Sequence, residues 1–169
     1  VYPLQWNKGD GCIYFNTNDE DCRNIYRYSP QTKKFEKLNL ETDVTSAFAL
    51  SENNPSIAAY IGQSNHNAGV AYLYDMKKKT SRLLADPMKP ILDEIELGKT
   101  EPWNFTASDG TTIQGMMCLP PNFDPNKKYP LIVYYYGGTT PTERGISNPY
   151  CAQLFASRDY VVYVINPSG

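Results

Sequence analysis

Residues 129–169 read YPLIVYYYGGTTPTERGISNPYCAQLFASRDYVVYVINPSG, and this stretch decides the fold. The continuous apolar and aromatic run 131–136 predicts a strand covered on both faces, and 160–165 predicts a second buried strand. Between them, residues 149–157 can form a helix with Asn148 as its N-cap. This order of elements predicts a parallel strand pair joined by a right-handed crossover.

The first of these strands ends in a turn, Tyr136-Gly137-Gly138. Two glycines let the backbone turn sharply and let a bound molecule approach it closely. Because side chains alternate along a strand, Tyr134 and Tyr136 should share one face, and Tyr135 should lie on the other. From the strand pattern alone, three tyrosines that pack the sheet are the simpler interpretation.

The first half of the chain contains an internal repeat with a period of 46 residues. Three landmarks recur at this offset, as the pairs Tyr14 and Tyr60, Tyr26 and Tyr72, and Leu38 and Leu84. A period in the forties with about four strands per unit is typical of β-propeller blades. The alternative is two unrelated hairpin meanders in one small sheet. Because two blades cannot close a ring, we expect them to belong to a longer protein.

A change in composition separates this repeat from the rest of the chain. Pro87 and Pro90 break the pattern, and residues 89–101 are charged and aperiodic, which predicts a linker with one short helical turn. Beyond it, Ser108-Asp109-Gly110 lies between two strand-like runs and predicts a hairpin. We therefore divide the chain into two blades over 1–88, a linker over 89–101 and the start of a second domain over 102–169.

The bulk composition is that of a globular protein. The chain has 169 residues, of which 41% are hydrophobic, and a net charge of −2. This charge does not indicate a nucleic-acid partner. The longest apolar run, 131–136, is far shorter than the roughly 20 residues that span a bilayer. The chain starts at Val1 rather than Met, so we expect its true N-terminus to lie upstream, and the lack of a signal peptide carries no information.

The four cysteines do not define a compartment. Cys12 and Cys22 could face each other across a hairpin and form a disulfide, whereas free thiols packed as small apolar groups are the alternative. The one histidine, His66, lies in a polar loop and is predicted to be solvated. Cysteines and histidine lack the spacing of zinc ligands, and Gly137-Gly138 alone is not a phosphate-binding loop. We therefore expect neither a metal nor a cofactor.

Residues 104–169 resemble the start of the catalytic domain in the prolyl oligopeptidase family of serine peptidases. The resemblance is strongest to bacterial members similar to dipeptidyl peptidase IV. The matching segments are SDGTTIQG (108–115), LPPNFDPNKKYPLIV (119–133), YYYGG (134–138) and ASRDYVVYVINPSG (156–169). In that family a β-propeller precedes the hydrolase domain, which is also the order that the repeat indicates. The resemblance implies a mixed fold, with antiparallel propeller blades followed by the N-terminal part of an α/β-hydrolase fold.

The resemblance also implies roles for the turn residues. A tyrosine hydroxyl at this turn donates to the oxyanion that forms during peptide hydrolysis, and by position that tyrosine is Tyr136. Gly137 and Gly138 lie beside this oxyanion hole. The family often has proline directly after the glycine pair, whereas here Thr139-Thr140 come first. The path of the loop after the turn is therefore less defined by the resemblance than the turn itself.

The rest of the catalytic machinery is not evident in the chain. The G-x-S-x-G turn that carries the nucleophile should follow later, and the aspartate and histidine should come after it. Ser168 lacks those flanking glycines and is interpreted as a loop serine. His66 precedes the whole hydrolase segment, so it does not match the catalytic base. We expect this piece by itself to be inactive.

The resemblance implies a serine peptidase that hydrolyses short peptides, as a dipeptidyl or prolyl-type exopeptidase that is periplasmic or secreted. A non-catalytic binding module of the same fold and an esterase are the alternatives. The expected partner is a peptide substrate, and unpaired sheet edges predict self-association. Glu143, in the loop after the turn, is predicted to be a solvated charge.

Overall fold

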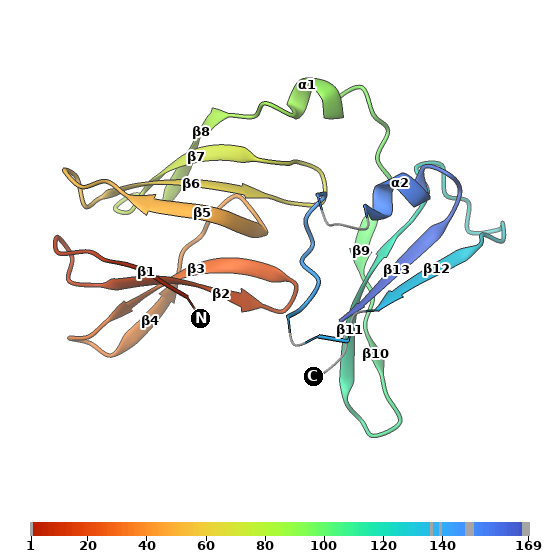
Figure 1. Ribbon diagram of the computed structural model, residues 1–169, viewed down its shortest axis with the longest axis horizontal. Coiled ribbons are helices and arrows are strands. Elements are labelled where there is room, and N and C mark those ends of the chain that lie inside the picture. Colours follow the sequence, from red (N-terminus) through yellow and green to blue (C-terminus); the bar gives the residue numbers. More distant parts are fainter. Residues whose placement is uncertain (1, 136, 139, 148–150, 167–169) are drawn as a thin grey trace.

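The computed structural model describes residues 2–135, 137–138, 140–147 and 151–166, and these residues form two β-sheets (Figure 1). The first sheet contains β1 Tyr2–Trp6, β2 Ile13–Asp19, β3 Cys22–Ser29, β4 Lys34–Lys37, β5 Val44–Leu50, β6 Ile57–Gln63, β7 Val70–Asp75 and β8 Thr80–Ala85. The second contains β9 Thr100–Pro102, β10 Phe105–Thr106, β11 Thr112–Cys118, β12 Leu131–Tyr135 and β13 Val161–Asn166. Helix α1, Lys89–Leu92, follows the first sheet, and α2, Ala152–Ala156, lies between β12 and β13 in the chain.

Within residues 2–85, which the structure describes without a gap, the first sheet consists of two antiparallel meanders of four strands each. We call β1–β4 the first meander and β5–β8 the second meander. They are joined where Arg23 pairs with Val44. Equivalent strands recur in the same order in both meanders, so the predicted repeat is confirmed.

The repeat extends to an unusual backbone conformation. Lys33 and Lys79 lie 46 residues apart, and their φ angles of 55° and 56° fall in the left-handed region. Each residue ends the turn before the last strand of its meander. The Lys33 N–H donates to the Ser29 carbonyl at 2.8 Å, and the Lys79 N–H donates to the Asp75 carbonyl at 2.7 Å. Residues other than glycine rarely adopt this conformation, so its recurrence indicates two copies of one structural unit.

The apolar faces of the two meanders are buried in one shared core. Tyr14 of β2 stacks on Phe48 of β5, with ring centroids 5.9 Å apart. Buried tyrosine hydroxyls need polar partners. The Tyr60 hydroxyl lies 2.7 Å from Ser81 Oγ and accepts a hydrogen bond from the Glu41 N–H at 3.0 Å. The buried members of this core are Cys12, Tyr14, Ile25, Leu38, Leu50, Ala58, Tyr60 and Tyr74.

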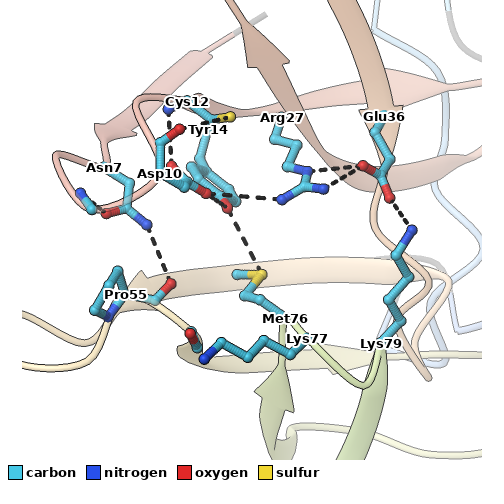
Figure 2. Close-up of polar contacts among 12 residues, drawn as sticks. Asn7, Asp10, Cys12, Tyr14, Arg27, Glu36, Pro55, Met76, Lys77 and Lys79 are labelled. Carbon is cyan, nitrogen blue, oxygen red and sulfur yellow. Dashed lines mark hydrogen bonds and ion pairs between the residues drawn. The ribbon is translucent and has the colours of Figure 1, made fainter.

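Figure 2 shows the polar contacts that link the two meanders beside this core. The Tyr14 hydroxyl donates to Asp10 at 2.7 Å; burial, and then this hydrogen bond, raise the pKa of Tyr14. Glu36 accepts hydrogen bonds from Arg27 of its own meander and from Lys79 of the second meander, each at 2.6 Å. The bonds from Lys79 and then from Arg27 hold the pKa of the Glu36 carboxyl below its usual value. Glu36 is therefore a charged bridge between the meanders.

In the second sheet the strand order is β10-β11-β13-β12, and β9 pairs with β11. β12 and β13 run parallel, from Leu131 opposite Val161 to Tyr135 opposite Ile165. β10 and β11 pair antiparallel, and the turn between them contains Gly110 with a φ of 87°. The predicted parallel pair and the predicted Asp-Gly hairpin are both confirmed.

Helix α2 packs on one face of the second sheet, where the buried side chains are Cys118, Ala156, Val162 and Val164. Ile132 and Tyr134 of β12 pack against this group. The alternate side chains of β12, which are Leu131, Val133 and Tyr135, are exposed, and Tyr135 is 73% exposed. The prediction of a strand covered on both faces is therefore wrong for residues 131–135. The reason is that β12 lies at the sheet edge and, among the described residues, α2 packs on the opposite face.

The predicted linker and helix differ from the structure at their ends. Within 89–101, α1 forms at the start, and β9 begins at Thr100, which pairs with Cys118. α2 begins at Ala152, inside the predicted span 149–157. The predicted N-cap, Asn148, lies outside the described residues.

The four cysteines, all of which the structure describes, are free thiols. Cys12 directly precedes β2, whereas Cys22 pairs with Asp19 at the far end of the β2–β3 hairpin. Seven strand residues separate the two positions, or roughly 20 Å at the usual rise of a strand. The possible disulfide between Cys12 and Cys22 is therefore excluded, and the alternative of packed free thiols holds.

We predict that Glu36→Gln destabilises the chain at pH 7 by about 1 kcal/mol, since the partly exposed pairs to Arg27 and Lys79 lose their charge. The pKa of Glu36 is depressed, so the stabilisation exists above its ordinary pKa of 4.5 and is lost as the pH falls through the lower folded value. Urea unfolding at pH 7 and pH 3 measures the difference. Glu52→Gln, in the exposed β5–β6 turn, is the matched control. An equal effect of Glu36→Gln at both pH values would contradict the prediction.

Candidate active site

The predicted oxyanion turn follows β12, at the end of the parallel strand pair. Tyr136 itself lies outside the described residues, so its role stays a prediction. Tyr134 is half-buried and Tyr135 is exposed, which confirms the predicted alternation for these two. Gly137 is exposed, and a Cβ added to it would meet no atom of the described residues within 4 Å. The backbone after β12 is therefore open on the side where that Cβ would point.

The segment after this turn, which we call the 140–147 loop, runs between the two sheets (Figure 1). Asn166, the last residue of β13, holds the beginning of the loop. Its Oδ1 accepts a hydrogen bond from the Thr142 N–H at 2.8 Å, and its Nδ2 donates to the Thr142 carbonyl at 3.1 Å. This two-way bond satisfies the peptide groups of Thr142 as a strand partner would.

The middle of the loop is held by charges on the β2–β3 hairpin of the first sheet. Nε and Nη2 of Arg144 donate to Asp21 Oδ1 at 2.9 and 2.6 Å, and the Arg144 N–H donates to the Asp21 carbonyl at 2.9 Å. Arg23 Nε donates to Glu143 Oε1 at 2.8 Å. We call these four residues the hairpin–loop contact. The prediction that Glu143 is a solvated charge is wrong, because its side chain is only 20% exposed and is paired with Arg23.

Two groups at the hairpin–loop contact, Arg144 and the neighbouring Cys22, have raised pKa values. The hydrogen bond to Asp21 raises the pKa of Arg144, so the guanidinium stays charged. Burial raises the pKa of the neighbouring Cys22 thiol to about 11, so this sulfur is neutral at physiological pH. The hairpin therefore presents its charges to the loop through Asp21 and Arg23, while the cysteine between them contributes none.

The end of the loop lies against the β6 end of the first sheet. The Ile146 N–H donates to the Ser64 carbonyl at 2.9 Å, and the Ser147 N–H donates to Gln63 Oε1 at 3.2 Å. A Cβ at Gly145 would overlap the amide group of Gln63. A larger residue at position 145 would therefore require the Gln63 side chain, which binds Ser147, to move.

A serine–histidine pair lies next to this contact. Ser64 Oγ is 3.2 Å from His66 Nδ1, a distance at which a histidine can activate a hydroxyl. Ser64, however, is only 3% exposed, so its hydroxyl is closed to a substrate. His66 is exposed in a loop of the first sheet, as predicted. The contact therefore lies within the loop that follows β6, and we assign the pair no catalytic role.

Between the 140–147 loop and the second sheet lies a cavity of about 160 Å³. Its walls are mostly apolar and include Met116, Ile132, Tyr134, Ile146, Phe155 and Val164. These side chains suit an apolar group rather than a charged one. Within the part of the chain that the structure describes, no group of three or more His, Cys, Asp and Glu residues could hold a metal ion.

Comparison with known proteins finds dipeptidyl peptidases among the relatives of this chain. No protein-family model matches the chain. The chain is 26% identical, over its whole length, to dipeptidyl-peptidase 5 of Porphyromonas gingivalis, of which the match covers 24%. It is 43% identical over 60 residues, or 35% of the chain and 8% of the relative, to a probable dipeptidyl-peptidase 5 of Aspergillus terreus. It is 27% identical, over 90% of the chain and 19% of the relative, to dipeptidyl peptidase 4 of Trichophyton rubrum.

Solved structures share the fold at low sequence identity. An acylaminoacyl peptidase in complex with Z-Gly-Gly-Phe-chloromethyl ketone matches with a TM-score of 0.77 and 22% identity, over 98% of this chain and 25% of that one. Dipeptidyl peptidase 4 of Porphyromonas gingivalis matches with a TM-score of 0.72 and 18% identity, over 98% and 24%. The fold is thus the one found in peptidases of this class.

The relatives and the fold neighbours together support a dipeptidyl peptidase IV-like member of the prolyl oligopeptidase family. The resemblance predicted from residues 104–169 is therefore confirmed. The chain spans about a quarter of the length of the Porphyromonas relative that it matches end to end. No helix among the described residues is long and apolar enough to span a membrane.

Sequence reasoning missed the residues that hold the 140–147 loop. Arg144 and Asp21 are 123 positions apart in the sequence, and neither residue belongs to a recognisable motif. Asn166 lies in a segment that carries the family resemblance, 156–169, but the resemblance does not indicate a bond to Thr142. Ser168, interpreted as a loop serine, lies outside the described residues.

We predict that Asn166→Ala releases the start of the 140–147 loop. Two hydrogen bonds to Thr142 are lost, each worth about 1 kcal/mol, so the Thr142 amide should exchange at least about tenfold faster. Hydrogen exchange followed by mass spectrometry or NMR measures this. Asn126→Ala, in an exposed loop, is the control and should leave Thr142 unchanged. Unaltered exchange at Thr142 in Asn166→Ala would show that other contacts hold the loop.

Proposed function

We propose that this chain is part of a serine peptidase that hydrolyses short peptides as a dipeptidyl or prolyl-type exopeptidase. In this proposal residues 1–88 are the last two blades of a β-propeller, 89–101 are a linker, and 102–169 begin an α/β-hydrolase catalytic domain. One observation carries it: the whole chain aligns with a dipeptidyl-peptidase 5. The order of two repeated meanders followed by a sheet with a parallel pair supports the same assignment.

Tyr136 is the residue to which we assign chemistry. Peptide hydrolysis passes through a tetrahedral oxyanion, and a fixed donor near that oxygen lowers the barrier. Tyr136 directly follows β12, and strand alternation would direct its side chain to the same side as Tyr134. The free space beside Gly137 among the described residues supports the approach of a substrate carbonyl at this turn. The described residues thus support a donor at this position, with Gly137 and Gly138 beside it.

Two other functions use the same fold. A binding module would bind peptides without cleaving them, and an esterase would use the same oxyanion donor on smaller substrates. An acylaminoacyl peptidase with a peptidyl chloromethyl ketone is among the fold neighbours, and this favours peptide substrates for the present chain.

We also propose, from the family resemblance, that the whole protein is periplasmic or secreted. Cell fractionation that finds it in the cytoplasm would contradict this location.

We predict that Tyr136→Phe in the whole protein lowers kcat on dipeptidyl p-nitroanilides by about 10²–10³, because one oxyanion donor is lost while the ring is kept. KM should change little, since the bond forms in the transition state. Tyr135→Phe, on the opposite and exposed face of β12, is the matched control and should retain the wild-type kcat. A Tyr136→Phe enzyme as active as wild type would refute the assignment.

Two further assays separate the alternatives. Wild-type protein that hydrolyses p-nitrophenyl esters but no peptide would indicate an esterase, and peptide binding without turnover would indicate a binding module.

The 169-residue chain by itself contains no G-x-S-x-G, and its only histidine is His66. It should therefore be inactive. Turnover by this chain that Tyr136→Phe removes would contradict that expectation.

We further propose that the 169-residue chain self-associates through β12. This strand is a sheet edge, and its Leu131, Val133 and Tyr135 side chains are exposed. Exposed edges with apolar side chains recruit other strands. Solution scattering should give a mass above 19.1 kDa that falls when Val133 is replaced by Lys. A monodisperse monomer of wild-type chain would contradict the proposal.

A further inference from the structure

The hairpin–loop contact has a paired design that a random surface contact would lack. Asp21 and Arg23 lie on either side of Cys22, and Glu143 and Arg144 are adjacent in the loop. Each acidic residue faces a basic one, so Asp21 meets Arg144 and Arg23 meets Glu143. The signs match only in this one alignment of hairpin and loop. The contact therefore specifies a register between the two sheets as well as an attraction.

The hairpin is a rigid support for these charges. β2 and β3 pair without a break from Ile13–Tyr28 to Asp19–Cys22, and the turn between them is Glu20-Asp21. Glu20 holds the left-handed conformation, with a φ of 59°. The Asp21 carboxylate is only 13% exposed, so solvent screens its bond to Arg144 less than it would screen a surface pair. The backbone bond from Arg144 N–H to the Asp21 carbonyl adds a link that does not depend on charge.

The contact lies close in sequence to the predicted oxyanion turn. Five residues separate Gly138 from Arg144, and Thr142 among them is bonded on both sides by Asn166. The loop is therefore held from the second sheet at Thr142 and from the first sheet at Glu143 and Arg144. Thr142 is two residues from Arg144, so a shift of the hairpin would act directly on the residue that Asn166 holds at the end of β13.

We propose that Asp21 and Arg23 are positioning residues, which hold the 140–147 loop and through it the Tyr136-Gly137-Gly138 turn in its active geometry. The inference rests on the proposed peptidase function. It makes turnover depend on the docking of the first sheet, since separation of the hairpin from the loop would free the turn. Because an oxyanion donor acts in the transition state, loss of its position lowers kcat rather than raising KM.

The kinetic test uses the whole protein and exchanges the charges of one pair. Asp21→Arg and Arg144→Asp should each lower kcat about tenfold or more, with KM changed less than about threefold. The double variant, which restores opposite charges, should recover most of the lost kcat. Glu20→Arg, an exposed neighbour with the same charge change, is the matched control and should keep the wild-type kcat. Single variants with wild-type kcat, or a double variant no better than the singles, would overturn the proposal.

A second measurement does not depend on activity. Hydrogen exchange at the Thr142 and Arg144 amides should accelerate in Asp21→Arg, stay unchanged in Glu20→Arg and recover in the double variant, with thermal unfolding confirming that each variant is folded. If the wild-type protein hydrolyses no peptide, the proposed function fails, and unchanged exchange in Asp21→Arg would then overturn the contact as well. If Tyr136→Phe abolishes activity but Asp21→Arg changes neither kcat nor exchange, the proposed function stands and this inference alone is wrong.

Discussion

A four-stranded antiparallel meander cannot bury its apolar face by itself, and in this protein two such meanders bury theirs against each other. The stack of Tyr14 on Phe48 lies in this shared core, and every tyrosine placed there brings a hydroxyl that must be satisfied. Asp10 and Ser81 are placed by that requirement. The charged bridge at Glu36 then joins the meanders where the core reaches solvent. Apolar packing therefore brings the two meanders together, and the polar contacts fix how they are aligned on each other.

The two sheets meet in a different way. Among the described residues, the first sheet binds the 140–147 loop through ion pairs and hydrogen bonds, from Asp21, Arg23, Gln63 and Ser64. Interfaces of this polar kind can separate without exposing a core. The first sheet is therefore held together by its apolar core. Its hairpin–loop contact with the segment that leads to the second sheet is polar and fits in one alignment. This polar contact is the physical basis on which we propose that the hairpin controls the candidate active site.

Local periodicity predicted most of the fold. The 46-residue repeat, the Asp-Gly hairpin and the parallel pair all depend on patterns within a few residues or on a fixed spacing, and all are present. The prediction that β12 is buried on both faces is wrong, because apolar residues on both faces do not reveal which face another element will cover. The prediction that Glu143 is a solvated charge is wrong because its partner, Arg23, lies 120 positions away in the sequence.

The sequence by itself determined the repeat, the order of elements, the family resemblance and Tyr136 as the residue to test, because each rests on neighbouring residues or on regular spacing. Only the tertiary structure decided which residues hold the 140–147 loop and why Cys12 and Cys22 stay apart. Partners such as Asp21 and Arg144 come together only when the two sheets fold. The local sequence pattern around each residue does not reveal its distant partner. Strand register likewise sets the cysteines at opposite ends of one hairpin.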